Sequence, residues 1–308
     1  WTPKMVTLQT LQVKEDDDGI RLDRWFKRHF PDIGHGQLEK LLRKGEIRLD
    51  GKRAKSNTRI EEGQEVRVPP VKIDARPRAK KVSTDNITDR DVEMLRQSVI
   101  HKDDHIIAIN KPAGLAVQGG SGQSKHIDAM LNGLQFEMKE RPKLIHRLDK
   151  DTSGVLLLAR TTKAASMLTK AFKSKDVHKV YWAAVVGLPE IKSGKIDMAL
   201  EKHSGKFGEK VVADPNGKRA VTYYRTVDNA SNKATWLAMM PETGRTHQLR
   251  AHCAELGTPI LGDGKYGGVD AFLEGAEGVE KQLHLHAKAI KFPHPAGGYF
   301  QVVSDLAP

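Results

Sequence analysis

The sequence predicts an α+β protein, in which a small α/β domain at residues 11–70 precedes a larger domain at residues 91–308 with a mixed, mostly antiparallel sheet. Its 308 residues are enough for two domains. Apolar residues recur at helical spacing in the first segment, and short apolar runs separated by glycine-rich turns fill the second. Residues 71–90 are polar, basic and aperiodic, which is typical of a linker.

Two short helices and a hairpin are expected in the small domain. Leu22, Trp25 and Phe26 mark the first helix, and a second apolar repeat ends before Gly45. The dipeptide Asp50-Gly51 is typical of a tight turn between two antiparallel strands. A further short strand is expected at residues 66–68, so the segment combines both kinds of secondary structure.

The larger domain is expected to be rich in strands. Apolar runs at residues 105–109 and 155–159 predict two of them. Thr161 or Thr162 is expected to cap a helix whose apolar face includes Met167. Further strands are predicted at three segments: residues 178–184, 222–224 and 235–239.

Composition favours a cytoplasmic protein that binds a polyanion. The formal net charge is +12 and the isoelectric point is about 9.6. No run approaches the roughly 20 apolar residues of a membrane span, and the first residues lack the apolar core of a signal peptide. The single cysteine, Cys253, excludes an internal disulfide and a cysteine-based metal site.

The positive charge is concentrated near the N-terminus. Between Arg21 and Arg59 there are twelve basic and five acidic residues, as a surface that binds RNA or DNA requires. The alternative is a solvated basic face without a partner. The residues expected to contact RNA are Arg21, Arg24, Lys40, Arg43, Lys44, Arg48, Lys52 and Arg53.

Three stretches of the small domain resemble a known RNA-binding module. They are residues 19–23 (GIRLD), 41–47 (LLRKGEI) and 62–66 (EGQEV). The segment is similar to the αL module shared by a small-subunit ribosomal protein, tyrosyl-tRNA synthetases and several RNA-modifying enzymes. The resemblance implies that this domain binds RNA.

The densest group of chemically active side chains is residues 144–154 (LIHRLDKDTSG), directly before the predicted strand 155–159. Loops held by a buried strand often carry catalytic groups. Asp149 stands between basic neighbours, Arg147 and Lys150, which favour its ionised form, so it is a candidate nucleophile or base. The alternative is that Asp149 and Asp151 cap a turn through their side chains.

A second polar group, residues 243–252 (TGRTHQLRAH), offers Arg245, His247, Arg250 and His252 to hold a phosphate or to orient a carboxylate. A metal site is not favoured. The spacing of His247 and His252 does not place two ligands on one helical face, and few acids surround His284 and His286. The glycine-rich residues 118–122 lack the lysine that ends a P-loop.

Ordered motifs over nearly all of residues 100–307 resemble the RluA-type pseudouridine synthases. These motifs are residues 111–114 (KPAG), 146–154 (HRLDKDTSG), 179–181 (KVY), 244–250 (GRTHQLR), 261–263 (LGD), 266–267 (YG) and 285–287 (LHA). With the αL module, the chain is most similar to the C type of large-subunit ribosomal RNA enzymes, and the D type is the nearer rival. Gln118 departs from the histidine expected before the glycine-rich loop.

The resemblance implies an RNA uridine isomerase. Asp149 would be the catalytic aspartate, Tyr181 would stack on the target base, and Arg250 would pair with the aspartate. Leu285 would pack against the base, and Arg147 would help to displace it from the RNA stack. The resemblance also implies no metal and no organic cofactor, a ribosomal RNA substrate and a monomer.

The remaining residues expected to contact substrate are His146, Arg245 and His247. Two functions of other classes are also consistent with a basic RNA-binding chain. A non-catalytic ribosome-assembly factor would keep its function without Asp149. A metal-dependent nuclease would be sensitive to chelators and would cleave its substrate.

Overall fold

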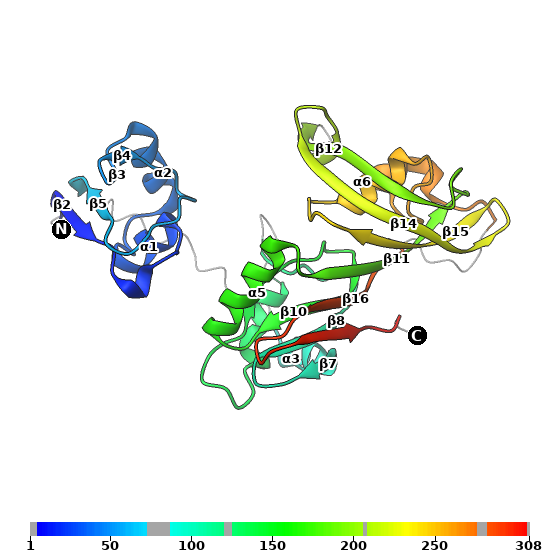
Figure 1. Ribbon diagram of the computed structural model, residues 1–308, viewed down its shortest axis with the longest axis horizontal. Coiled ribbons are helices and arrows are strands. Elements are labelled where there is room, and N and C mark those ends of the chain that lie inside the picture. Colours follow the sequence, from blue (N-terminus) through cyan, green and yellow to red (C-terminus); the bar gives the residue numbers. More distant parts are fainter. Residues whose placement is uncertain (1–4, 73–86, 120–124, 206–207, 276–281, 307–308) are drawn as a thin grey trace. The chain divides into compact units, whose positions relative to one another are not determined.

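The computed structural model describes residues 5–72, 87–119, 125–205, 208–275 and 282–306. The chain divides into two compact units, Trp1–Lys81 and Val82–Pro308 (Figure 1). Most of the expected linker (73–86) and of the expected glycine-rich loop (120–122) lies outside the described residues. No helix of the described ranges has the length and hydrophobicity needed to cross a membrane.

The first unit packs two helices on a four-stranded sheet with the order β2-β5-β3-β4, and β1 pairs with β6. Trp25, Phe26 and Leu42 are buried in its core, which explains the helical spacing of its apolar residues. Its elements are β1 (Met5–Val6), β2 (Gln9–Gln12), η1 (Glu15–Asp17), α1 (Leu22–His29), α2 (His35–Lys44), β3 (Arg48–Leu49), β4 (Lys52–Arg53), β5 (Glu65–Val68) and β6 (Val71–Lys72).

The predicted ends of these elements are confirmed by their backbone geometry. Gly45 has a left-handed φ of 71°, and its N–H donates to the carbonyls of Leu41 and Leu42, so it ends α2. Asp50 and Gly51 have φ of 48° and 72°, as a tight turn of two left-handed residues requires. They join β3 to β4 with Leu49 opposite Lys52.

The second unit is built on one mixed sheet, which has eleven strands within the described residues. Its main path is β13-β12-β14-β15-β11-β16-β10-β8-β7, and β17 and β9 pair beside it. The strands are β7 (Val99–Lys102), β8 (Ile106–Lys111), β9 (Lys143–Leu144), β10 (Ser153–Ala159), β11 (His178–Val186), β12 (Ser193–Gly205), β13 (Gly208–Ala213), β14 (Lys218–Ala230), β15 (Ala234–Pro241), β16 (Leu285–Pro293) and β17 (Tyr299–Val303).

Two helices, α5 and α6, pack on different groups of strands in this sheet. Apolar residues of α5 pack on β8, β10 and β16, and apolar residues of α6 pack on β11 and β15 (Figure 1). The helical elements are α3 (Asp89–Gln97), α4 (Ile127–Met130), η3 (Leu131–Leu134), α5 (Thr162–Ser174), α6 (Gln248–Glu255), α7 (Gly264–Gly267) and η4 (Gly268–Ala271). Among the named strands of the described residues, pairing is antiparallel except between β10 and β16, so the predicted α+β class with a mostly antiparallel sheet is confirmed.

The helix expected after the second strand is α5, and its N-cap is Thr161, whose side chain accepts from the Ala164 N–H. Met167 was expected on its buried face, but 45% of its surface is exposed. Ala164, Leu168 and Ala171 form the buried face instead. The expected pattern was therefore right about the helix and wrong about one of its residues.

Gly154 allows β10 and β16 to approach closely beside the loop of Asp149. Its φ is +105°, and a Cβ atom there would lie 2.3 Å from the carbonyl oxygen of Ala287. No other residue fits between the two backbones without moving one of them. The end of the polar stretch is therefore anchored to a strand more than a hundred residues away in the sequence.

Candidate active site

Asp149 lies on the loop that joins β9 to β10. The Thr152 N–H donates to the backbone carbonyl of Asp149 at 3.2 Å, which closes a turn. The Asp149 carboxylate itself forms no hydrogen bond or ion pair with any described residue. The alternative interpretation, that this side chain caps the turn, is therefore wrong, and both of its oxygens remain available to a substrate.

A cavity of about 490 Å³ opens in front of this carboxylate. It is formed by the Asp149 loop, the end of α5, the start of β11 and the segment between β15 and α6. All eight residues that the sequence nominated for catalysis or substrate contact line it: His146, Arg147, Asp149, Tyr181, Arg245, His247, Arg250 and Leu285.

The apolar part of the cavity wall includes Leu148, Tyr181 and Leu285. Leu148 and Leu285 are buried, and Tyr181 is partly buried on β11, where it packs against the cores on both sides of the cavity. Burial raises the pKa of Tyr181, and the negative charge of Asp149 adds to the shift. The phenol is therefore neutral and offers a ring face for a base to stack on.

Arg250 lies beside Asp149 but is bound to a different carboxylate. Its Nε and Nη2 atoms donate to the two oxygens of Asp263 at 2.7 and 2.6 Å. The expected ion pair between Arg250 and Asp149 is therefore replaced by a buried pair with Asp263. Asp149 still interacts with Arg250 electrostatically, so the two side chains act on each other without a direct bond.

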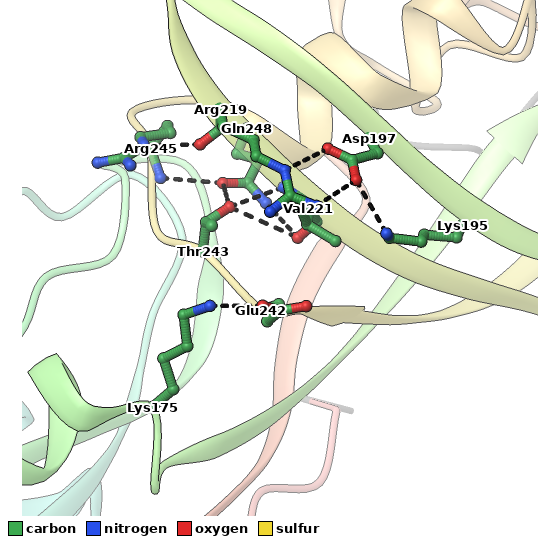
Figure 2. A network of polar contacts seen from close by, with 9 residues as sticks. All are labelled: Lys175, Lys195, Asp197, Arg219, Val221, Glu242, Thr243, Arg245 and Gln248. Atoms are coloured by element: carbon green, nitrogen blue, oxygen red, sulfur yellow. Dashed lines mark hydrogen bonds and ion pairs between the residues drawn. The ribbon is translucent and has the colours of Figure 1, made fainter.

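Gln248 holds the cavity wall that carries Arg245. Its amide nitrogen donates to the Val221 carbonyl, and its amide oxygen accepts from the Thr243 hydroxyl at 2.7 Å and the Arg245 N–H at 3.0 Å (Figure 2). The Arg245 Nε in turn donates to the carbonyl of Arg219 at 3.1 Å. This buried amide joins β14 to the loop before α6, a role that sequence reasoning missed.

His146 is a hydrogen-bond acceptor inside the protein. Its Nε2 accepts from the Leu157 N–H at 2.9 Å, and its ring stacks on Phe172 with centroids 4.9 Å apart. Burial lowers the pKa of His146 to about 3, and the nearby Lys179 cation adds to this shift. The neutral ring therefore ties the Asp149 loop to β10 and has at most its Nδ1 atom for a substrate.

Lys111 fixes the same loop from the other side. Its buried Nζ donates to three carbonyls, those of Pro112, Leu115 and Lys150, each at 2.8 Å. The Lys150 carbonyl directly follows Asp149 in the chain. Burial lowers the pKa of Lys111 to about 8. Lys111 belongs to the motif KPAG (residues 111–114), but the motif alone does not reveal which carbonyls the side chain binds.

The mouth of the cavity is rimmed by positive charge. Arg147 is exposed and pairs with no described residue. Lys179 also lines the cavity, and burial lowers its pKa. Lys175, at the end of α5, forms an ion pair of 2.5 Å with Glu242, which follows β15 (Figure 2). These cations suit a substrate that carries phosphates.

Metal ligands are not gathered among the described residues, where no group of three or more His, Cys, Asp and Glu is placed to hold an ion. His286 uses both ring nitrogens inside the protein: Nδ1 is 2.9 Å from the Ser153 hydroxyl and Nε2 is 3.3 Å from the Ser304 carbonyl.

The cations nominated in the first unit lie on its surface. Arg43 and Lys44 end α2, and the Arg53 side chain reaches Gly45 at the same helix end. Arg48 is partly buried and donates to the Gly51 carbonyl at 2.9 Å, and Arg21 pairs with Asp23. The exposed members of the set are Arg21, Arg24, Lys40, Arg43, Lys44, Lys52 and Arg53.

Comparison with known proteins gives one consistent result. Residues 105–255 match the family described as RNA pseudouridylate synthase. A protein of Rickettsia bellii named ribosomal large subunit pseudouridine synthase C is 38% identical over 272 residues, which cover 88% of each chain. A protein of the same name from Vibrio cholerae is 35% identical over 291 residues, covering 94% of this chain and 90% of the relative.

Solved structures agree with this assignment. The human RNA pseudouridylate synthase domain containing 4 superposes with a TM-score of 0.57 and 29% identity, covering 70% of this chain and 91% of that chain. The human RNA pseudouridylate synthase domain containing 1 gives the same TM-score with 25% identity. The family and the isomerase class expected from the motifs are thereby confirmed, and the chain belongs to the RNA pseudouridylate synthase family.

Proposed function

We propose that this enzyme converts uridine to pseudouridine in large-subunit ribosomal RNA and that Asp149 is its catalytic carboxylate. The observation that carries the proposal is the cavity in which the other seven nominated side chains line the space around the Asp149 carboxylate, which has no ion-pair partner among the described residues. The names of the relatives favour the target uridines of the C-type enzymes over those of the D-type enzymes.

The reaction is an isomerisation, so atoms are conserved. The bond between ribose C1′ and uracil N1 breaks, the uracil turns, and C1′ joins C5, while C5 loses a proton and N1 gains one. An Asp149 oxygen would either attack a carbon of the ribose or base, or remove a ribose proton to give a glycal. Either route needs a carboxylate oxygen that the protein does not occupy.

The target nucleotide must leave the RNA stack to reach Asp149, at a cost of a few kcal/mol. In this proposal the exposed guanidinium of Arg147 fills the vacated space, and the cations at the cavity mouth hold the backbone. Tyr181 stacks on the uracil and Leu285 packs against it, which keeps the detached base close to the sugar until it rejoins.

The proposal is tested with a transcript of large-subunit ribosomal RNA and two variants of one loop. Asp149→Asn preserves shape but removes the reactive oxygen charge, and we expect pseudouridine formation to fall on the order of 10⁴-fold. The matched control is Asp151→Asn, because that side chain is exposed and bonds to no described residue. Its rate is expected to stay within about twofold of wild type.

RNA binding measured in parallel separates chemistry from affinity. We expect both variants to bind the transcript as tightly as wild type, because the cations that contact phosphate are unchanged. Turnover by Asp149→Asn at more than about a tenth of the wild-type rate would contradict the proposed role.

The monomeric state stays a prediction, which light scattering on the purified protein tests.

A further inference from the structure

Glu242 is an unexpected charge at the mouth of the cavity. Two acids line this cavity, Asp149 and Glu242, against six lysine and arginine side chains. Asp149 is the proposed catalytic group, but the reaction gives no role to a second carboxylate. A negative charge at this place repels the phosphates that the cations of the mouth attract. Glu242 therefore has an effect on RNA binding that its neighbours do not explain.

The carboxylate of Glu242 is paired with Lys175 across the mouth. Its Oε1 lies 2.5 Å from the Lys175 Nζ, and the two residues are 67 positions apart in the chain (Figure 2). Lys175 caps the end of α5 with a left-handed φ of 67°, a conformation that glycine usually adopts at a helix end. The Glu242 N–H donates to the Val221 carbonyl at 3.0 Å. Both backbones are thus fixed, and only the two side chains bridge the walls.

This pair is accessible to a competing ligand. The side chain of Lys175 is 57% exposed and that of Glu242 is 33% exposed. The bond to Lys175 lowers the pKa of Glu242, so the carboxylate is ionised at neutral pH. Exposed ion pairs of this kind contribute little to stability, because water and salt screen them. A second anion can therefore take the lysine at a small cost in free energy.

An RNA backbone is a stronger competitor than a single carboxylate. Phosphate oxygens accept charge-assisted hydrogen bonds from an ammonium group as carboxylate oxygens do, and a strand presents them in series. Lys173 and Arg245 line the same mouth, are exposed and have no acidic partner among the described residues. A strand that reaches Lys175 therefore also meets two cations that it does not have to share.

We infer that Lys175 is a phosphate-binding residue for the RNA substrate and that Glu242 occupies it in the free enzyme, so that RNA must displace the carboxylate to enter the cavity. This deepens the proposed function and rests on it for the identity of the ligand. Glu242 acts through Lys175 and lowers the affinity of the enzyme for RNA. Neither residue takes part in the chemical step.

Lysine footprinting tests the contact directly. The enzyme is treated with an amine-acylating reagent, with and without the ribosomal RNA transcript, and modified lysines are identified by mass spectrometry. We expect saturating RNA to protect Lys175 about fivefold, because phosphates then cover its ammonium group. Lys170 is the internal control, because it is exposed on the same helix but lies outside the cavity lining. Its reactivity should change by less than about 1.5-fold.

The salt dependence of binding provides a second measure of the same contact. Lys175→Gln should reduce the slope of log affinity against log salt by about 0.7–0.9, which corresponds to one phosphate. Lys170→Gln should leave this slope unchanged.

Two acid-to-amide variants test the role of Glu242. Glu242→Gln should raise the acylation rate of Lys175 in the free enzyme and increase the affinity for RNA about two- to fivefold, as the loss of an exposed ion pair allows. Asp197→Asn is the matched control. Asp197 pairs with Arg219 at 2.5 Å and with Lys195 at 2.8 Å, outside the cavity lining (Figure 2). This control loses the same charge and should change the affinity by less than about 1.5-fold.

The outcomes separate this inference from the proposed function. An Lys175 that RNA does not protect, or an equal gain in affinity for Glu242→Gln and Asp197→Asn, would overturn it, because the charge would then act without displacement of the pair. An affinity of Glu242→Gln equal to that of wild type would overturn it as well. A wild-type enzyme that binds the transcript and protects Lys175 but forms no pseudouridine would instead defeat the proposed function alone.

Discussion

The imidazole of His146 is a structural hydrogen-bond acceptor in the wall of the cavity in front of Asp149. Its Nε2 accepts from the Leu157 N–H, and burial lowers the pKa of the ring to about 3. Protonation would abolish the acceptor and place a charge beside Phe172 and Lys179. The loop that carries Asp149 is therefore expected to lose support in acid.

This predicts a stability difference that depends on pH. The unfolded state takes up a proton at His146 near pH 6.5, and the folded state does so only near pH 3, so the stabilisation is complete above pH 6.5 and is lost as the pH falls toward 3. His146→Gln keeps an acceptor but does not titrate. Between pH 6.5 and 5.0 the free energy of unfolding of wild type should fall by about 1–2 kcal/mol more than that of the variant. Urea denaturation at the two pH values measures both proteins. An equal fall in the free energy of unfolding of wild type and of His146→Gln would contradict this prediction.

At the scale of single residues, the sequence allowed the cavity to be predicted better than its internal bonds. Asp149, Tyr181 and Arg250 belong to short motifs whose residue types are chemically distinctive, and all three line one cavity. The partner of Arg250 was not predictable, because Asp149 and Asp263 are both acids and only the tertiary structure decides which one reaches it. The three carbonyls bound by Lys111 are a further example, since backbone groups leave no mark in a sequence.

At the scale of elements, the site depends on the place where β10 meets β16. The parallel pair Ser153–His286 and Gly154–Ala287 lies directly after the Asp149 loop, and no Cβ fits at Gly154. The loop can reach the cavity only because the two backbones touch there. A side chain at this position would separate the strands and displace the loop that carries Asp149.

Gly154→Ala is therefore expected to lower the free energy of unfolding by about 3–5 kcal/mol and to reduce pseudouridine formation in whatever protein folds. Gly114→Ala is the matched control, because Gly114 also has a positive φ of +79° but no atom within 4 Å of its ideal Cβ. It should cost only about 1–2 kcal/mol, the price of a left-handed alanine. Chemical denaturation measures the free energy of unfolding of both variants. An equal loss in the two would contradict the close approach of β10 to β16 at Gly154.

Local signals were sufficient for elements formed by neighbouring residues. The helices of the first unit followed from apolar spacing and Gly45, and the hairpin followed from Asp50-Gly51. The parallel pairing of β10 with β16 was not predictable, because the two strands are far apart in the sequence and both are simply apolar. Met167 failed for a similar reason: helical spacing identifies a face but not how far the neighbouring elements extend over it.

At the scale of the whole molecule, the charge is unevenly distributed along the chain. More than half of the net charge of +12 comes from the segment between Arg21 and Arg59, whose nominated cations are mostly exposed. The cavity of the second unit is lined by cations of its own, which in the proposed function hold the RNA backbone near the target uridine. We therefore expect the first unit to contribute affinity and site selection, and the second unit to contribute chemistry.

Changing Arg43, Lys44, Lys52 and Arg53 together to Gln should weaken RNA binding and reduce the slope of log affinity against log salt by about 3. The saturated rate should stay within about twofold of wild type. The control variant changes four exposed lysines of the second unit away from the cavity, Lys163, Lys170, Lys192 and Lys233, to Gln. Equal salt slopes for the two variants would show that the basic surface of the first unit has no special role.

A division of the chain into two domains was expected from the composition, but the composition did not settle the function of the protein. A basic segment is also consistent with a solvated surface that has no partner, and only the motifs of the second unit identified a reaction. The most direct measurement is a map of pseudouridines in ribosomal RNA from cells that lack this protein. The account predicts that specific pseudouridines of the large-subunit RNA disappear and are restored by wild type but not by Asp149→Asn; restoration by Asp149→Asn would contradict it.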